Sequence, residues 1–398
     1  MSNWKTYKLG EIAKIIGGGT PSTSKEEYWN GEIGWLTPRD LTGYSYKYIS
    51  KGERNITAIG LKNSSARLMK EGTVLMTSRA PIGYLAIAGN ELCTNQGFKS
   101  FIVNEDKINN EYLYYLLKNN ISRIKSLGTG STFAEVSASI LKELEIQAPE
   151  LTTQNQIAEI LSSLDDKLEL LQQMNQTLEN IAQEIFENML VTKNKKGWEE
   201  IRLGDIIEIK GGFSYKSQFI GSGDSLLLGM GCVSFNERFL FSGARPYSGE
   251  FNNNYLAKSG DIVIATRQQS DNLPILGFPA KVPKSLDNKK VIVGTNLYKV
   301  NNHSNFHNTF LFQLFRSNDY RKHILANSKG STVRMITKDS VENYLFKIPP
   351  KEVFRDIEAV LNAIDYRIED NTFQIQTLTQ TRDTLLPKLM SGQLEIKN

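Results

Sequence analysis

The sequence has little of several features that would assign it to a class of protein at once. It holds only two cysteines in 398 residues, Cys93 and Cys232, too few by themselves for a disulfide framework or a zinc cluster. We expect both thiols to be buried as small apolar groups. No apolar run is long enough to span a bilayer, and residues 1–10 lack the apolar segment of a signal peptide. These features predict no membrane partner and a cytoplasmic location.

Charge of one sign is also scarce, because 47 Lys and Arg residues stand against 43 Asp and Glu residues, a formal net charge of +4. Such a small excess does not by itself identify a nucleic-acid-binding protein. The distribution is uneven, with 18 basic and 15 acidic residues in 1–150 and 19 and 13 in 197–350, but 4 and 7 in 151–196 and 6 and 8 in 351–398. If DNA is the partner, the two basic segments should meet its phosphates.

An internal repeat is the main feature that is present. Residues 4–12 (WKTYKLGEI) return as 198–206 (WEEIRLGDI), and 70–79 (KEGTVLMTSR) match 258–267 (KSGDIVIATR). Shorter matches pair residues 17–18 with 211–212, 94–95 with 295–296, and 130–132 with 330–332. A length of 398 residues suits two or three globular units, so we expect two similar halves of about 200 residues. Such copies suit a target with two-fold character.

Each half divides into a lobe and a long helix. Residues 72–87 and 260–280 are β-branched and punctuated by glycine, whereas 110–120 and 308–317 have the apolar spacing of a helix. Prolines at 149 and at 349–350 mark where this pattern ends. We therefore predict a mixed α/β lobe at 1–150, a helical arm at 151–196, a second lobe at 197–350 and a second arm at 351–398.

Both arms show the four-three spacing of a coiled-coil seam. Thr153 and Gln156 could form a capping box at the start of the first, and Gly392 is placed to end the second. Packing of each helix on its own lobe is the simpler alternative, but the two seams match each other. The seam positions are Ile157, Leu161, Leu164, Leu168, Leu171, Asn175, Leu178, Ala182, Ile185 and Met189, then Ile357, Leu361, Ile364, Ile368, Asn371, Ile375, Leu378, Arg382, Leu385 and Leu389.

An antiparallel pairing in which partner numbers sum to 546 gives every seam position a partner. In this register Asn175 meets Asn371, so that two buried amides can satisfy each other rather than face leucine. We expect this pair to fix the register. Arg382, opposite Leu164, is the exception, and we expect its head to reach water. A seam of roughly 50 Å, at about 1.5 Å per residue, would hold two lobes apart about a pseudo-two-fold axis.

The order of lobe, long helix, lobe and long helix resembles the specificity subunits of type I restriction–modification enzymes over essentially the whole chain. Local strings similar to theirs are GGGTPS at 17–22, MTSR at 76–79, NQGF at 95–98, QIAEIL at 156–161 and LLPKLMSG at 385–392. The resemblance implies a non-catalytic subunit without cofactors, whose two target recognition domains each read one half of a bipartite site in double-stranded DNA. It also implies that the helices bind two adenine methyltransferase subunits, with translocase and nuclease subunits in the full complex.

The two lobes are not identical, which implies different half-sites. Residues 222–234 match 31–43 only loosely, and 268–274 have no counterpart in the first copy. Polar loop residues beside glycine or proline are the candidate DNA contacts, with phosphate contact favoured over base readout. They are Thr20, Ser22, Thr23, Arg39, Arg79, Asn95, Gln96 and Lys99 in the first lobe and Tyr215, Lys216, Arg267, Gln268, Gln269, Asn296, Lys329 and Arg334 in the second. Arg79 and Arg267 recur at equivalent positions.

Other motifs carry little weight. Residues 17–19 are interpreted as a turn, since no P-loop lysine follows. Asp205, Glu208 and Lys210 resemble a nuclease cluster but are not repeated in the first lobe, residues 272–275 lack the aromatic residue of an amino-methyltransferase loop, and His303 with His307 has no third metal ligand. The alternatives to a DNA-binding scaffold are an enzyme fragment with its own nuclease or methyltransferase activity, and a structural protein that uses the coil only to oligomerise.

Overall fold

The computed structural model describes residues 4–129, 134–191, 196–268, 275–330 and 333–396. It divides into two compact units, Met1–Leu170 with Gln376–Asn398, and Leu171–Ile375. Each unit contains one lobe together with part of each long helix, α6 (Leu151–Val191) and α10 (Lys351–Met390). Among the described residues, no helix is long and apolar enough to cross a membrane.

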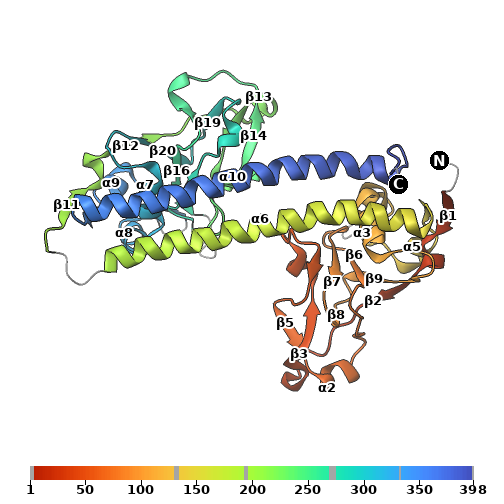
Figure 1. Ribbon diagram of the computed structural model, residues 1–398. Coiled ribbons are helices and arrows are strands. Elements are labelled where there is room, and N and C mark those ends of the chain that lie inside the picture. Colours follow the sequence, from red (N-terminus) through yellow and green to blue (C-terminus); the bar gives the residue numbers. More distant parts are fainter. Residues whose placement is uncertain (1–3, 130–133, 192–195, 269–274, 331–332, 397–398) are drawn as a thin grey trace. The chain divides into compact units, whose positions relative to one another are not determined.

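Lobe 1, residues 5–148, combines three sheets with short helices. Its strands are β1 (Lys5–Lys8), β2 (Ala13–Gly17), β3 (Trp29–Leu36), β4 (Tyr48–Ile49), β5 (Arg54–Ile56), β6 (Val74–Thr77), β7 (Leu85–Ala88), β8 (Leu92–Thr94), β9 (Phe98–Val103) and β10 (Glu145–Ala148), and its helices are α1 (Leu9–Ile12), α2 (Ala58–Lys62), α3 (Asn110–Asn119), α4 (Ile121–Ser126) and α5 (Ala138–Lys142). The sheets have the orders β2-β9-β6-β7-β4, β5-β3-β8 and β1-β10. Figure 1 shows β3, β5 and α2 on the side of the lobe far from α6.

Lobe 2, residues 199–348, repeats this plan with four strands in place of five in the first sheet, four in place of three in the second, and one further ribbon. Its strands are β11 (Glu199–Arg202), β12 (Ile207–Gly211), β13 (Ile220–Leu228), β14 (Ala244–Tyr247), β15 (Leu256–Ala257), β16 (Ile262–Ala265), β17 (Arg267–Gln268), β18 (Pro279–Lys281), β19 (Val291–Val293), β20 (Leu297–Asn302), β21 (Arg334–Met335) and β22 (Leu345–Ile348), and its helices are α7 (Asn308–Arg316), α8 (Asn318–Ala326) and α9 (Lys338–Glu342). The sheets have the orders β12-β20-β16-β18, β14-β13-β19-β15, β11-β22 and β17-β21. The mixed α/β prediction is therefore confirmed.

Equivalent hydrogen bonds show that the two lobes are copies of one fold. Leu9 N donates to Leu144 O at 2.9 Å, and Leu203 N donates to Tyr344 O at 2.8 Å. Both cysteines are fully buried, as expected. In each unit the core of the lobe continues into the helices, because one cluster of buried side chains contains residues of the lobe, of α6 and of α10.

Gly18 and Gly212, the second glycine of each matched pair, are explained by close backbone contact, whereas a Cβ on Gly17 or Gly211 would meet open space. Gly17 ends β2 and residues 18–19 are not in a turn, so the interpretation of residues 17–19 as a turn is wrong. A Cβ on Gly18 would lie 2.1 Å from the carbonyl oxygen of Asn95, and one on Gly212 would lie 2.0 Å from that of Gly294. Real Cβ atoms essentially never lie closer than 3.0 Å to such a neighbour, so a side chain at either position would force the backbone to shift. The chain leaves β2 and β12 alongside β8 and β19, and only glycine permits that approach.

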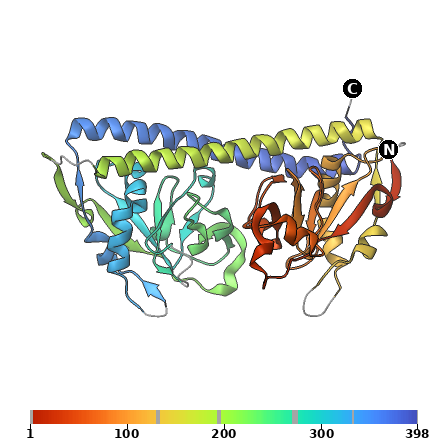
Figure 2. The same ribbon diagram turned by 90° about the horizontal axis from the view of Figure 1, so that it is seen from below.

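Within each unit the two long helices run side by side and antiparallel (Figures 1 and 2). Their register is the predicted one, since Asn371 contacts Asn175. Ile157, Leu161 and Leu389 share one core cluster in the first unit, and Ala182, Met189 and Leu361 share another in the second. Helix α6 begins at Leu151, so the expected capping box at Thr153 and Gln156 is absent from its start. Gly392, with a φ of +69°, follows the end of α10 as expected.

Asn175 and Asn371 lie in one layer of the helix pair. Asn371 Nδ2 donates to Asn175 Oδ1 at 2.8 Å, while Asn175 Nδ2 donates to Thr372 Oγ1 at 3.4 Å. The amides are therefore joined by one hydrogen bond rather than two, and Thr372 takes the second donor. Asn371 is fully buried, so this layer tolerates leucine opposite an amide poorly.

The expectation that Arg382 reaches water is wrong. Its guanidinium donates to Asp165 Oδ1 at 2.7 Å, and the side chain is only 16% exposed. Asp165 is nearly buried and also accepts a hydrogen bond from the Tyr115 hydroxyl at 2.7 Å. A cation at a seam position is thus stabilised by a carboxylate on the facing helix, which the heptad pattern could not indicate.

The Asn175–Asn371 layer makes a testable prediction about the register. Replacing Asn371 alone by leucine leaves the Asn175 carbonyl oxygen without its donor, which should lower the free energy of unfolding by about 1–3 kcal/mol. Replacing both by leucine should restore most of this loss, because no buried amide remains. Chemical denaturation of the two single variants and the double variant measures the coupling. Additive effects would show that the pair does not set the register.

Candidate nucleic-acid interface

In both lobes one candidate arginine follows a central strand and enters a junction of three segments. Ser78 N donates to Gly97 O at 2.7 Å and Val136 N donates to Ser78 O at 3.0 Å; in lobe 2, Thr266 N donates to Asn296 O and Ile336 N donates to Thr266 O, both at 3.1 Å. Arg79 and Arg267 are the next residues along the chain. The structure therefore brings each arginine next to the loop after β8 or β19 and next to the segment before α5 or α9.

In lobe 1 the cations of this junction share one carboxylate. Glu135 Oε2 lies 3.5 Å from Arg79 Nη1, and Glu135 Oε1 lies 2.9 Å from Lys99 Nζ. Lys99 Nζ also donates to Ser78 Oγ at 3.2 Å. Two positive charges and one negative charge leave a net positive site, in which a DNA phosphate would compete with Glu135 for Arg79.

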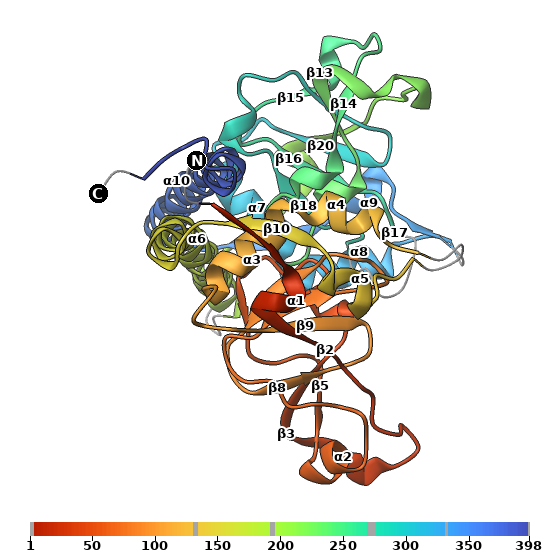
Figure 3. The same cartoon turned by 90° about the vertical axis from the view of Figure 1, so that its right-hand side faces the viewer.

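In lobe 2 the corresponding position carries no carboxylate. The bridges Thr129 with Glu135 and Lys329 with Met335 are equivalent, so Met335 replaces Glu135. In ribbon β17-β21, Gln268 pairs with Arg334 and Arg267 with Met335. Arg267, Lys329 and Arg334 are all exposed, and the described residues provide no ion pair to any of them. Figures 2 and 3 show this ribbon, with β17 labelled in Figure 3, on the side of lobe 2 away from α6 and α10.

Three further lobe 1 candidates lie on the segment after β2, and one of them contacts the loop after β8. Thr20 Oγ1 donates to Gln96 Oε1 at 2.6 Å, and the indoles of Trp29 and Trp35 donate to the carbonyl oxygens of Ser22 and Gly19. These two bonds hold the segment that presents Ser22 and Thr23, both of which are exposed.

The side chains of Asn95 and Arg39 differ in whether they are available to contact a ligand. The Asn95 side chain accepts a hydrogen bond from Gly97 N at 2.8 Å, so it shapes its own loop. Arg39 is 84% exposed, 3.8 Å from Glu53, and follows Pro38, which lies against Gly97. Arg39 is therefore available to a ligand beside this loop, whereas the Asn95 carbonyl is engaged.

Lobe 2 contains a cleft of about 280 Å³ at its candidate residues. Tyr215 and Asn296 both line it, together with Arg245 and Ser242. Lys216 is exposed immediately after Tyr215. The cleft brings one aromatic ring, one amide and one guanidinium together, which are groups that stack on bases or pair with their edges.

Arg54 and Arg245 form a second repeated pair of arginines that the sequence did not reveal. Arg54 pairs with Trp35 in β5-β3, and Arg245 pairs with Leu227 in the equivalent β14-β13. Both are exposed. The Arg54 guanidinium lies 3.6 Å from the centre of the Trp29 ring, a stacked cation–π contact. Residues 54–56 (RNI) and 245–247 (RPY) share only the arginine. The equivalence of the two arginines is therefore visible from the strand register and not from the sequence.

The structure also corrects the matching of residues 94–95 with 295–296. Asn95 N donates to Leu36 O as Gly294 N donates to Leu228 O, and Thr77 pairs with Phe98 as Ala265 pairs with Leu297. Asn95 is therefore equivalent to Gly294, and Asn296 to Gly97. The sequence match is wrong by two residues, and Asn95 and Asn296 are not repeated contacts.

Some candidates fall outside the described residues. These are Gln269, the side chain of Gln268, and most of the GST strings at 130–132 and 330–332, as well as residues 272–274 of the methyltransferase-like string. Asp205 pairs with Arg202 at 2.9 Å, Glu208 accepts a bond from Asn301, and His307 caps α7. In the part of the chain that the structure describes, no cluster of His, Cys, Asp or Glu could hold a metal ion.

Comparison with known proteins gives consistent matches along the whole chain. Residues 1–180 and 195–380 match the family described as type I restriction modification DNA specificity domain. The chain is 34% identical to the type I restriction enzyme MjaIX specificity subunit of Methanocaldococcus jannaschii, over 99% of this chain and 94% of that protein. The MjaVIII specificity subunit of the same organism is 23% identical over 100% and 94%.

A solved structure shows the same fold. The S subunit of a type I restriction–modification system from M. genitalium superposes with a TM-score of 0.61 at 18% identity. The alignment covers 99% of this chain and 97% of that one. At this identity the likeness concerns the arrangement of the chain alone.

Proposed function

Because the chain belongs to the type I restriction–modification DNA specificity family, we propose that it is the DNA-recognition subunit of such a complex. Each lobe binds one half of a bipartite site in double-stranded DNA. The paired helices set the distance between the half-sites and dock two adenine methyltransferase subunits. Restriction and translocase subunits join in the full complex, and the chain itself takes no part in bond making or breaking.

The observation that carries this proposal is the strand-end junction that is built twice. The same backbone hydrogen bonds in both lobes present Arg79 and Arg267 after a central strand. A repeated framework that ends in an arginine suits phosphates, which recur along DNA whatever its sequence. A second repeated pair, Arg54 and Arg245, supports the same role.

Differences between the lobes support two different half-sites. Glu135 accompanies Arg79, whereas Met335 occupies the equivalent position near Arg267. Stacking of Arg54 on Trp29 in lobe 1 is replaced in lobe 2 by an arginine at the edge of a cleft beside Tyr215. Base contacts would then differ, while the phosphate contacts stay alike.

Exposed apolar side chains on α10 support the docking of protein subunits. Val360, Tyr366 and Phe373 are 47%, 74% and 59% exposed. Aromatic side chains of this kind are enriched at protein–protein interfaces.

Mapping methylated adenines tests the proposal. The chain is produced with the adenine methyltransferase subunit of its own system, and host DNA is sequenced by a method that detects N6-methyladenine. The expected result is a single motif of two different half-sites with a fixed spacer, lost when either subunit is omitted. Methyl transfer by the purified chain alone, or methylation without a bipartite motif, would overturn the assignment.

A further inference from the structure

One position in each lobe directs a buried cation at the long helices. Ile87 N donates to Lys47 O at 2.8 Å, and Lys281 N donates to Arg238 O at 3.0 Å. Ile87 and Lys281 are themselves equivalent, because they pair with Val74 and Ile262. Lys47 and Arg238 therefore occupy the same place in the fold, although the loops around them share no sequence pattern.

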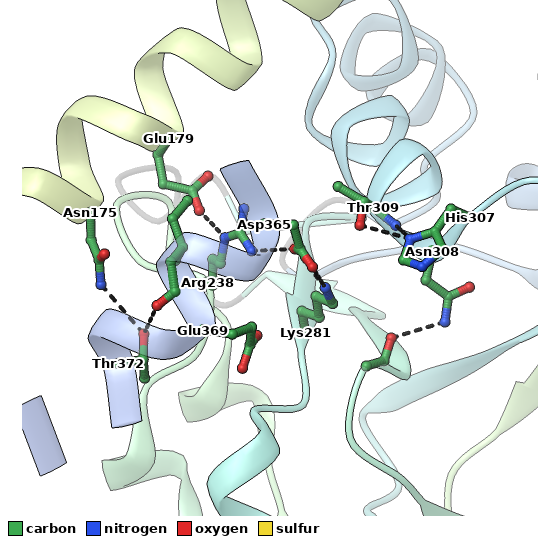
Figure 4. A network of polar contacts seen from close by, with 12 residues as sticks. Asn175, Glu179, Arg238, Lys281, His307, Asn308, Thr309, Asp365, Glu369 and Thr372 are labelled. Atoms are coloured by element: carbon green, nitrogen blue, oxygen red, sulfur yellow. Dashed lines mark hydrogen bonds and ion pairs between the residues drawn. The ribbon is translucent and has the colours of Figure 1, made fainter. Parts of the chain in front are cut away.

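Arg238 is bonded to both long helices at once (Figure 4). Its Nε donates to Glu179 on α6, and its Nη1 donates to Asp365 on α10. The Arg238 side chain is 9% exposed, and the two carboxylates are 5% and 11% exposed. A guanidinium has its donors in a fixed plane, so the two bonds constrain where lobe 2 lies on the helix pair within its unit.

Two further cations complete the cluster, each bonded to one helix. Lys281 Nζ donates to both oxygens of Asp365 at 2.6 Å, and Arg316 Nη1 bonds Glu179. Glu369 on α10 lies close enough to attract Arg238 and Lys281 electrostatically. Three buried cations thus face three carboxylates of the helices, which offsets much of the cost of burial.

Lobe 1 is attached differently at the equivalent place. Lys47 Nζ lies 3.2 Å from Asp166 on α6 and 2.9 Å from Glu111 on α3, and its side chain is 2% exposed. Neither carboxylate partner of Lys47 lies on α10. In this unit an ion pair between the helices themselves, Asp165 on α6 with Arg382 on α10, links the two. Of the two equivalent residues, Lys47 and Arg238, Arg238 is therefore the one that bonds both long helices.

Apolar packing and directional bonds constrain the lobe in different ways. The aromatic contacts of Phe310 with Phe186 and Phe354 bind lobe 2 to both helices, but apolar contact is non-directional and tolerates small shifts. Charge-assisted hydrogen bonds from one planar group to two helices are directional, so they do not tolerate such shifts. Loss of one of the two bonds should therefore allow lobe 2 to shift or tilt without unfolding.

We propose that Arg238 is a positioning residue that holds lobe 2 in one orientation on α6 and α10, and thereby restricts the complex to one spacer length. This inference rests on the proposed function, under which the spacing of the half-sites depends on how each lobe is held. Arg238 acts through Glu179 and Asp365 and does not touch DNA.

The test compares Arg238→Lys with Arg316→Lys in the methyltransferase complex. Lysine keeps the charge but cannot hold both carboxylates in a fixed plane. Sequencing of N6-methyladenine on a plasmid library, in which the spacer differs from the wild-type length by one base pair in either direction, measures spacer selectivity. Arg238→Lys should raise methylation of the altered spacers relative to the wild-type spacer by about tenfold, the effect of one charge-assisted bond.

Arg316→Lys is the matched control, because Arg316 bonds only α6 within the same cluster and should leave spacer selectivity unchanged. A purely structural role would lower methylation of all spacers in parallel in both variants, and that result would overturn the proposal. Equal relaxation in both variants would also overturn it. The wild-type complex separates this from the proposed function: if it methylates no bipartite motif, the DNA-recognition assignment fails first.

Discussion

Replacement of Asp365 by alanine is expected to lower the free energy of unfolding by about 3–5 kcal/mol. Asp365 accepts both bonds of Lys281 and one bond of Arg238. Both cations are nearly buried, so removal of the carboxylate leaves charge in a site that water does not reach. Urea denaturation of the wild-type protein and the variant, followed by tryptophan fluorescence and circular dichroism, measures the difference.

Asp370→Ala is the control on the same helix. Asp370 is 41% exposed and lies 3.5 Å from Arg367, an exposed pair of the kind that contributes under about 1 kcal/mol. A loss for Asp365→Ala no larger than for this control would contradict a structural role of the buried cluster.

The same carboxylate predicts a dependence on pH. Burial opposes ionisation of Asp365, but Arg238 and Lys281 outweigh it and hold the pKa of this carboxyl below its ordinary value of 3.8. A group with a lowered pKa in the folded state stabilises the protein above its unfolded pKa, and this contribution is lost as the pH falls through the folded pKa. The stability difference between wild type and Asp365→Ala should therefore be constant above about pH 5 and shrink below pH 3.8.

Features that depend on local periodicity could be predicted from the sequence. The heptad seams fixed the partner of each helix position because the spacing of apolar residues determines which face is buried, and the two asparagines selected one register among several. The positions of Arg79 and Arg267 followed from a ten-residue repeat. These inferences needed no knowledge of the contacts between distant segments.

Features that depend on contacts between distant segments could not be predicted. Lys47 and Arg238 are equivalent only through the strands beside them, and their carboxylate partners lie on helices more than 50 residues away in sequence. Asn95 and Asn296 were matched because both follow a threonine. The backbone hydrogen bonds instead show that Asn95 is equivalent to Gly294 and Asn296 to Gly97. Short identical strings misalign loops of different conformation, so loop residues need the strand register.

A triple replacement of Arg267, Lys329 and Arg334 by alanine should reduce DNA affinity on the order of 100-fold, since each lost phosphate contact is expected to cost a few-fold to tenfold. These exposed side chains converge at ribbon β17-β21, where Met335 provides no competing carboxylate. The slope of log affinity against log salt concentration should become shallower by about 2–3, because each phosphate contact contributes about 0.9. Fluorescence anisotropy with a labelled duplex that carries the mapped site measures both quantities.

Replacement of three other exposed lysines of lobe 2, Lys258, Lys289 and Lys322, is the matched control. Both triple variants lower the net charge from +4 to +1, so a general electrostatic effect would weaken binding equally in the two. A loss confined to the ribbon variant, together with the change in salt slope, would locate phosphate contacts at the end of lobe 2. An unchanged salt slope in the ribbon variant would contradict phosphate contact there and leave base recognition at the cleft of Tyr215 and Arg245 as the main contribution of this lobe.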